Sequence, residues 1–355
     1  MQEKSFENQK DTVTAKCDGC GANMQFDPSI QMLKCPHCGS VKDFDKSSRV
    51  EEIDILTAFG QSETWESENS VYRCENCGAV VVLTGGQTAT KCPYCETSHV
   101  VKSTETAGLK PNAVYPFTLT VEQALESSKK WAKSKLFAPS KFKKNLNSED
   151  FRGVYQPCFT FDSQTTSFYT GRIGKRYTRV VGSGKNRRTE TYIVWRHISG
   201  TYNNFFNDVM INADGEYSQS LLNKLLPYDF NTIKVYEDEF LTGYMAKRSN
   251  KAVENCWKDA KSYMDASLRN MILSRYIYDV VDYLNISTTH DAVTYKYVLL
   301  PIYLHNYKYG KKLYSVHING NTGKIVGRSP VSPLKVLLAV VLGIAVIGLF
   351  GYLLM

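Results

Sequence analysis

The sequence lacks an apolar stretch near its N-terminus. Residues 1–16 are polar, whereas a secretory signal requires a core of about 7–15 apolar residues. Without such a signal, paired cysteines are more often metal ligands than disulfides. We therefore expect no disulfide framework of the secreted type, and we expect residues 1–16 to form a disordered tail.

Catalytic signatures are also missing. The chain contains no Gly-x-Ser-x-Gly, His-Glu-x-x-His or dinucleotide-binding motif. The segment Val181-Gly-Ser-Gly-Lys185 resembles part of a phosphate-binding loop. However, Arg179 stands where that loop requires glycine, and Asn186 stands where it requires serine or threonine. We therefore expect no enzyme activity and no small-molecule substrate.

Isolated cysteines and histidines do not form a catalytic pattern either. We expect buried free thiols at Cys158 and Cys256, with a nucleophile as the alternative. We expect packed or solvated side chains at His197, His290, His305 and His317. A third hypothesis stays open, namely an enzyme whose site is an unrecognised pocket within residues 111–330.

Charge is absent from the last twenty residues, Val336–Met355. A helix of that length spans roughly 30 Å, the thickness of a bilayer's hydrocarbon core. We therefore expect a transmembrane helix at 334–355, with a buried core helix as the alternative. Arg328 and Lys335 precede the segment, and the positive-inside rule keeps that side cytoplasmic. The pattern predicts a single-pass, tail-anchored protein of the cell membrane with cytoplasmic N-terminal domains.

Cysteine pairs are what the chain does contain, since eight of its ten cysteines form four Cys-x-x-Cys motifs. These form two repeats offset by 57 residues, each with 14 residues between its pairs. Structural zinc takes four ligands in a tetrahedron, and four thiolates leave no open position for catalysis. We therefore predict two structural zinc ions, with unmetallated or oxidised thiols as the alternative. The predicted ligands are Cys17, Cys20, Cys35 and Cys38 in the first ribbon, and Cys74, Cys77, Cys92 and Cys95 in the second. His37 and His99 are expected to be surface residues.

The remaining pattern divides the chain into domains. Thr120 can cap a helix over 120–136, and a further helix is expected over 252–275. Strands alternate with turns around them, which predicts an α+β, hairpin-rich domain. The expected order is zinc ribbon 1 at 17–45, a linker at 46–70, zinc ribbon 2 at 71–102, the α+β domain at 111–330 and the membrane helix.

The net charge is +8, and part of that excess gathers on one predicted hairpin. A solvated tip, contact with anionic lipid headgroups and contact with nucleic acid are the three alternatives for it. The cations of this hairpin are Arg172, Lys175, Arg176, Arg179, Lys185, Arg187 and Arg188.

Several motifs together resemble the bacterial TFIIB-type zinc-ribbon-containing membrane proteins. They are the two ribbons, Lys110-Pro-Asn-Ala-Val-Tyr-Pro-Phe117, Gly153-Val-Tyr-Gln-Pro157, Leu300-Pro-Ile-Tyr303 and Asn319-Gly-Asn-Thr-Gly-Lys-Ile-Val-Gly327. Some members are named as primosomal helicases, an activity from which this sequence departs because it has no nucleotide-binding motif. Some relatives are encoded beside phage-shock-type proteins, which implies an adaptor in membrane stress.

Two functions are weighed on these observations. The first is a membrane-anchored, zinc-binding adaptor that is not an enzyme, with the bilayer and one or more proteins as partners. The alternative is a nucleic-acid-binding zinc-ribbon protein tethered at the membrane, with a role in replication or transcription. Few lysines and arginines lie within the ribbons, which favours the adaptor.

Overall fold

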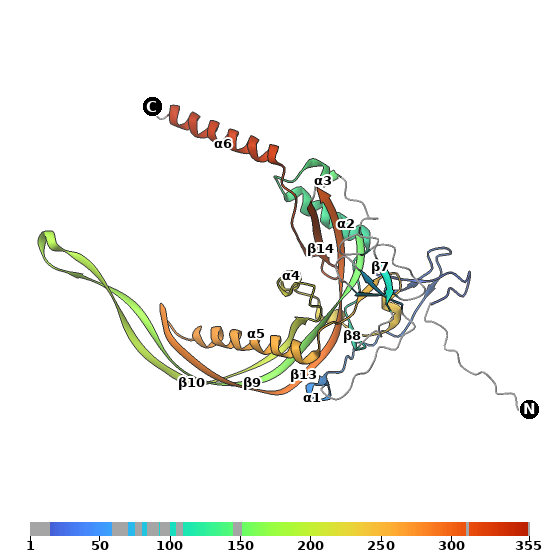
Figure 1. The fold of residues 1–355 in the computed structure, drawn as a ribbon, viewed down its shortest axis with the longest axis horizontal. Coiled ribbons are helices and arrows are strands. Elements are labelled where there is room, and N and C mark those ends of the chain that lie inside the picture. Colours follow the sequence, from blue (N-terminus) through green and yellow to red (C-terminus); the bar gives the residue numbers. More distant parts are fainter. Residues whose placement is uncertain are drawn as a thin grey trace, which may run out of the picture.

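The structure is a computed structural model that describes residues 15–58, 70–74, 80–83, 92, 100–103, 109–144, 151–309 and 312–353. The predicted tail at 1–16 therefore lies almost wholly outside the described residues. Three very long strands dominate the fold (Figure 1): β9 (Phe151–Val181), β10 (Arg188–Asn212) and β13 (Val280–Tyr309). Strand β9 lies between the other two and is antiparallel to both.

Shorter elements complete the described part. A small sheet consists of β1 (Gln25–Asp27), β2 (Met32–Lys34) and β3 (Val41–Lys42). The large sheet adds β4 (Ile53–Asp54), β5 (Ser70–Cys74), β6 (Val80–Leu83), β7 (Val100–Ser103), β8 (Ala113–Val114), β11 (Lys234–Val235), β12 (Met245–Lys247), β14 (Lys312–Asn319) and β15 (Ile325–Gly327). The helices are α1 (Ile55–Ala58), α2 (Val121–Ser134), α3 (Ser140–Lys144), α4 (Gln219–Leu225), α5 (Val253–Leu273) and α6 (Pro333–Leu353).

Each long strand is continuous through polar residues that, in the sequence, suggest a turn between two shorter strands. In β13 the register shifts between Asp291 and Thr294, and in β10 it shifts between Phe206 and Val209. Asp208 and Ala292 have positive φ angles of 53° and 48° at these shifts. A β-bulge absorbs such a residue without ending the pairing. Polar residues that indicate a turn in the sequence therefore bend one continuous strand.

Helix α5 covers one face of this curved sheet, as Figure 1 shows. Its buried side chains recur every four residues and form one stripe. Phe161 and Tyr295 of the sheet belong to the same hydrophobic cluster as the first four residues of this stripe, and the rings of Phe161 and Trp257 lie 5.6 Å apart. The stripe comprises Cys256, Ala260, Met264, Leu268 and Ile272.

Helix α2 begins as the sequence predicts, with Thr120 as its N-cap. The Gln123 N–H donates to the Thr120 hydroxyl at 3.4 Å, and the Thr120 N–H donates to the Gln123 side chain at 2.9 Å. Thr120→Ala leaves one helix N–H without its partner, so we expect a loss of about 1 kcal/mol in the free energy of unfolding. Urea denaturation checks this against Ser127→Ala on the same helix, for which we expect less than about 0.5 kcal/mol. Equal losses in the two variants contradict the capping role.

The predicted α+β class is wrong, because the structure is mixed α/β with a large mixed sheet. Strand β8 runs parallel to β13, and β12 runs parallel to β9. These pairs join segments that are far apart in the chain. Successive hairpins in a sequence indicate antiparallel neighbours only, so the parallel pairs have no local signal.

The predicted membrane anchor is also wrong. Within the part of the chain that the structure describes, we find no helix with the length and apolar character needed to cross a bilayer. Helix α6 covers the described part of this segment, and the Lys335 side chain in its first turn donates to the Ala138 carbonyl at 2.7 Å. The transmembrane helix at 334–355, the single-pass tail anchor and the cell-membrane localisation are therefore withdrawn.

Candidate metal centre

The first ribbon brings its two Cys-x-x-Cys turns together across the β1–β2 hairpin. Phe26 pairs with Leu33 in that hairpin. Each turn is closed by a glycine with positive φ, 72° at Gly21 and 75° at Gly39. The N–H groups of these glycines donate to the carbonyls of Cys17 and Cys35 at 2.8 and 3.0 Å. Only glycine adopts this left-handed backbone without strain, so the residue after each pair sets the shape of the turn.

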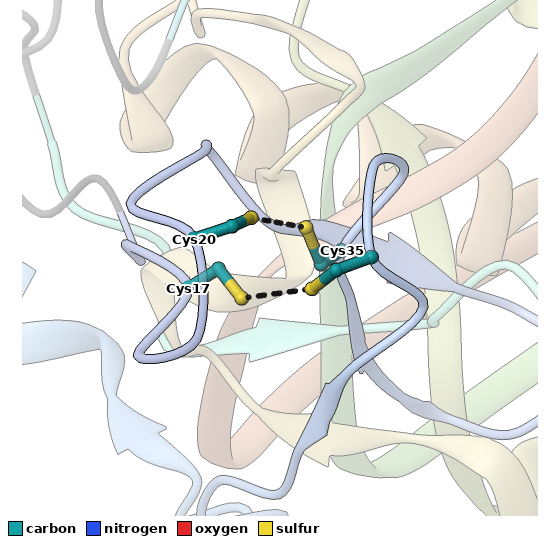
Figure 2. Close-up of side chains that lie close together, drawn as sticks. Cys17, Cys20 and Cys35 are labelled. Carbon is teal, nitrogen blue, oxygen red and sulfur yellow. Dashed lines mark hydrogen bonds between the residues drawn. The ribbon is translucent and has the colours of Figure 1, made fainter.

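The four sulfurs of this ribbon form one compact cluster. All four Sγ atoms lie within 4.8 Å of one another. Cys17 and Cys38 approach to 3.4 Å, and Cys20 and Cys35 approach to 3.5 Å. Figure 2 shows Cys17 and Cys20 on one turn, facing Cys35 across the gap. The predicted first ligand set is thus assembled as a site that could hold a metal ion.

The sulfur spacing fits a tetrahedral metal. A Zn–S distance of about 2.3 Å places tetrahedral sulfurs about 3.8 Å apart. The observed contacts of 3.4 and 3.5 Å lie slightly inside that value, so an ion fits with a small outward shift of the sulfurs. Four thiolates fill the coordination shell of such an ion, so this donor set suits a structural metal.

Hydrogen bonds around two of the four sulfurs favour the thiolate form that a metal needs. The Ser40 hydroxyl and N–H groups lower the pKa of the Cys38 thiol to about 6. The N–H groups of Cys38 and His37 lower the pKa of Cys35. The pKa of Cys20 is raised to about 12, although the Ala22 N–H lowers it, because its sulfur bonds to Cys35 and Cys38. The four neighbouring thiols are therefore not all deprotonated together easily. A metal cation bound among them would stabilise all four as thiolates.

The ribbon packs through aromatic side chains against the large sheet and its helices, which we call the body. Phe26 of β1 packs edge-on against Phe240 with ring centroids 5.3 Å apart. The Phe26 N–H donates to the Thr242 carbonyl at 3.1 Å, and the Gln31 side chain donates to the Phe117 carbonyl at 2.8 Å. Cys17, Cys35, Met24 and Leu33 share one buried cluster with Phe117 and Phe240. The candidate metal centre therefore lies against the core of the body.

The second predicted ligand set is described only in part. Cys74 and Cys92 are buried, whereas Cys77, Cys95 and His99 lie outside the described residues. His37 is exposed between two ligand cysteines of the first set.

The isolated cysteines are placed as the sequence suggested. Cys158 and Cys256 are fully buried. Burial raises the pKa of Cys158 well above its ordinary range and raises that of Cys256 to about 12. A nucleophilic cysteine needs its thiolate, so neither side chain has the electrostatics of a nucleophile.

The isolated histidines are mostly packed against neighbouring rings. His305 stacks on Phe151 at 4.9 Å, and His290 meets Trp257 edge-on at 5.6 Å. Burial lowers the pKa of His317 to about 4. His197 is exposed.

Sequence reasoning missed the residues that support the centre. Ser40 follows the second pair by two positions, and its hydroxyl lies 3.1 Å from the Cys38 sulfur. A small hydroxyl residue two places after a cysteine pair is a signal that could have been noticed. Phe240 carries no such signal, because it is about 200 residues away from the ribbon that it touches.

Comparison with known proteins adds one relative. The chain is 28% identical over 325 residues to a Bacillus subtilis (strain 168) protein described as "Uncharacterized protein YdjG". The match covers 91% of this chain and 92% of that protein. No family model and no solved structure matches the chain.

Proposed function

We propose that this chain is a zinc-binding adaptor without enzyme activity, in which metal holds a recognition surface on the first zinc ribbon. Two structural zinc ions are proposed, one in each ribbon, with Cys17, Cys20, Cys35 and Cys38 as the ligands of the first. The observation that carries the proposal is the closed cluster of four sulfurs within 4.8 Å. Such a site shapes a surface and leaves no coordination position for a substrate.

The ribbon offers apolar side chains to a partner. One side of it is buried against Phe240, while Ile30 and Val41 are 42% and 55% exposed. Apolar side chains held rigidly at a surface are suitable contacts for another protein. The resemblance to TFIIB-type zinc-ribbon proteins supports a setting in membrane stress.

Aspartate at these two positions tests the adaptor role. The double variant Ile30→Asp/Val41→Asp changes only exposed side chains, so we expect unchanged metal content and stability but loss of the chain's partners. In-cell crosslinking with quantitative mass spectrometry measures those partners. Leu56→Asp, at a position 72% exposed on helix α1, is the matched control and should keep them. If the double variant retains every partner that the wild type captures, the ribbon is not the recognition surface.

A further inference from the structure

The β9–β10 hairpin extends beyond the rest of the sheet as a two-stranded arm. Strand β13 pairs with β9 only as far as Gly174, opposite Val280. Strands β9 and β10 continue together to the pair Val181 and Arg188. Figure 1 shows this arm projecting past the end of helix α5. At about 3.3 Å per residue, the stretch from 174 to 181 is roughly 23 Å long. We call residues 175–194 the arm.

The arm is strongly basic, as are the residues at its base, 172–174 and 195–196. Residues 172–196 contain eight lysines and arginines and one acidic residue, Glu190. Arg179 and Arg188 both pair with Glu190, at 3.2 and 2.9 Å. At the base, Arg172 pairs with Asp282 at 2.6 Å.

Other cations of the segment keep their charge uncompensated. The Asp279 carboxylate accepts a hydrogen bond from the backbone N–H of Arg176, at 2.7 Å, and not from its side chain. Among the ion pairs of the described residues, none involves the side chains of Lys175, Arg176, Arg187 or Arg196. The excess therefore remains available to an anionic partner.

Cations lie on both faces of the arm. Residues directly opposite each other in an antiparallel pair share a face, and neighbours along a strand alternate between faces. Lys175, Arg179 and Arg188 therefore lie on one face, whereas Arg176 lies on the other with Ile193 opposite it.

The face that carries Lys175 and Arg179 also carries a stacked aromatic pair. The rings of Tyr177 and Tyr192 stack across the strands at 5.8 Å. Lys175 lies 5.8 Å from the Tyr177 ring centroid, and Arg179 lies 5.6 Å from that of Tyr192. These contacts hold the cations along the ribbon before any partner arrives.

We propose that this arm binds double-stranded DNA by entering its major groove, largely without regard to sequence. The groove is about 12 Å wide, admits a two-stranded β-ribbon and has a phosphate backbone along each wall. A ribbon with cations on both faces can meet both walls, whereas a flat bilayer or a single strand meets one face. The tip, Gly182–Arg187, contains no apolar residue for insertion into lipid. The major groove of A-form RNA is too narrow for side chains to enter, which favours DNA.

The test uses the full-length chain and fluorescence anisotropy on a 24-base-pair duplex over a range of salt concentrations. Each phosphate contact contributes a slope of about −0.9 to log K against log[salt]. The arm variant Lys175→Gln/Arg176→Gln/Arg187→Gln should therefore flatten the wild-type slope by up to about 2.7. At low salt it should bind at least tenfold more weakly. The control Lys129→Gln/Lys133→Gln/Lys141→Gln removes three exposed cations from α2 and α3 and should stay within twofold of the wild type.

Parallel measurements with a single strand of the same sequence and with phosphatidylglycerol vesicles separate the alternatives. The proposal predicts tighter binding to the duplex than to either. It is overturned if the wild type does not bind the duplex at low salt, or if the control variant loses as much affinity as the arm variant. Preference for the vesicles or for the single strand also overturns it. The proposal is independent of the adaptor function, because the metal centre contributes no residue to the arm.

Discussion

Replacing Cys35 by serine is expected to release the metal from the first ribbon and to unfold that ribbon. Cys35 is one of four sulfurs clustered within 4.8 Å, and a serine hydroxyl is a poor substitute for a thiolate on zinc. Metal binding in isolated zinc-finger peptides provides roughly 10–16 kcal/mol, which is in effect their folding free energy. The ribbon has a small core around Met24, Phe26 and Leu33, so it depends on the metal in the same way.

The unfolding should be confined to the ribbon and should not extend into the large sheet. Phe26 touches Phe240 and bonds to Thr242 there, whereas β9 and β13 hold each other by pairing over most of their length. Hydrogen exchange followed by mass spectrometry should therefore show lost protection in residues 17–42 and unchanged protection in β9 and β13. His37→Ala, an exposed change inside the same turn, should leave the exchange of residues 17–42 as in the wild type. Wild-type protection in Cys35→Ser would mean that metal does not hold this ribbon.

Lys247→Met is expected to destabilise the body by roughly 3–5 kcal/mol, because it leaves a buried carboxylate without its cation. The side chains of Lys247 and Asp214 are 4% and 1% exposed and form an ion pair. Asp214 also accepts hydrogen bonds from Asn250 at 3.1 Å and from Gln156 at 3.3 Å. These neutral donors do not replace the charge of Lys247. Urea denaturation of the full-length chain measures the loss.

A nearby lysine provides the control for this prediction. Lys251 pairs with Asp259 at 3.5 Å, and both side chains are accessible to solvent. Exposed pairs contribute about 0–1 kcal/mol, so Lys251→Met should change stability little. The double variant Lys247→Met/Asp214→Asn removes the charge left behind and should recover part of the loss. If Lys247→Met costs no more than Lys251→Met, water reaches Asp214 and the pair is not buried in solution.

Local signals in the sequence predicted the local parts of this structure. Thr120 and the apolar spacing behind it are enough to start α2, because a capping box is formed by residues three apart. The stripe in α5 repeats every four residues, so it is visible without knowledge of its partner. The first candidate metal site follows from its cysteine spacing. Each Cys-x-x-Cys motif forms a short turn, and one hairpin joins the two turns.

Contacts between distant segments could not be predicted in this way. The packing of Phe26 against Phe240 and the ion pair between Lys247 and Asp214 are two examples. No sequence motif links the residues that meet in these contacts. The bulge at Ala292 resembles a turn in the sequence, because its polar neighbours also suit a loop. The membrane helix was predicted from an uncharged apolar run of twenty residues, but among the described residues no helix is long and apolar enough to cross a bilayer.

The X-ray absorption spectrum of the full-length chain at the zinc edge tests the central claim most directly. The four-cysteine site predicts a first shell of sulfur alone, with four scatterers at about 2.3 Å. The same shell should describe both ions, since both predicted ligand sets are cysteines. A first shell with nitrogen or oxygen at about 2.0–2.1 Å would mean an open or mixed site. That result, or a chain purified without bound zinc, would contradict a closed structural centre.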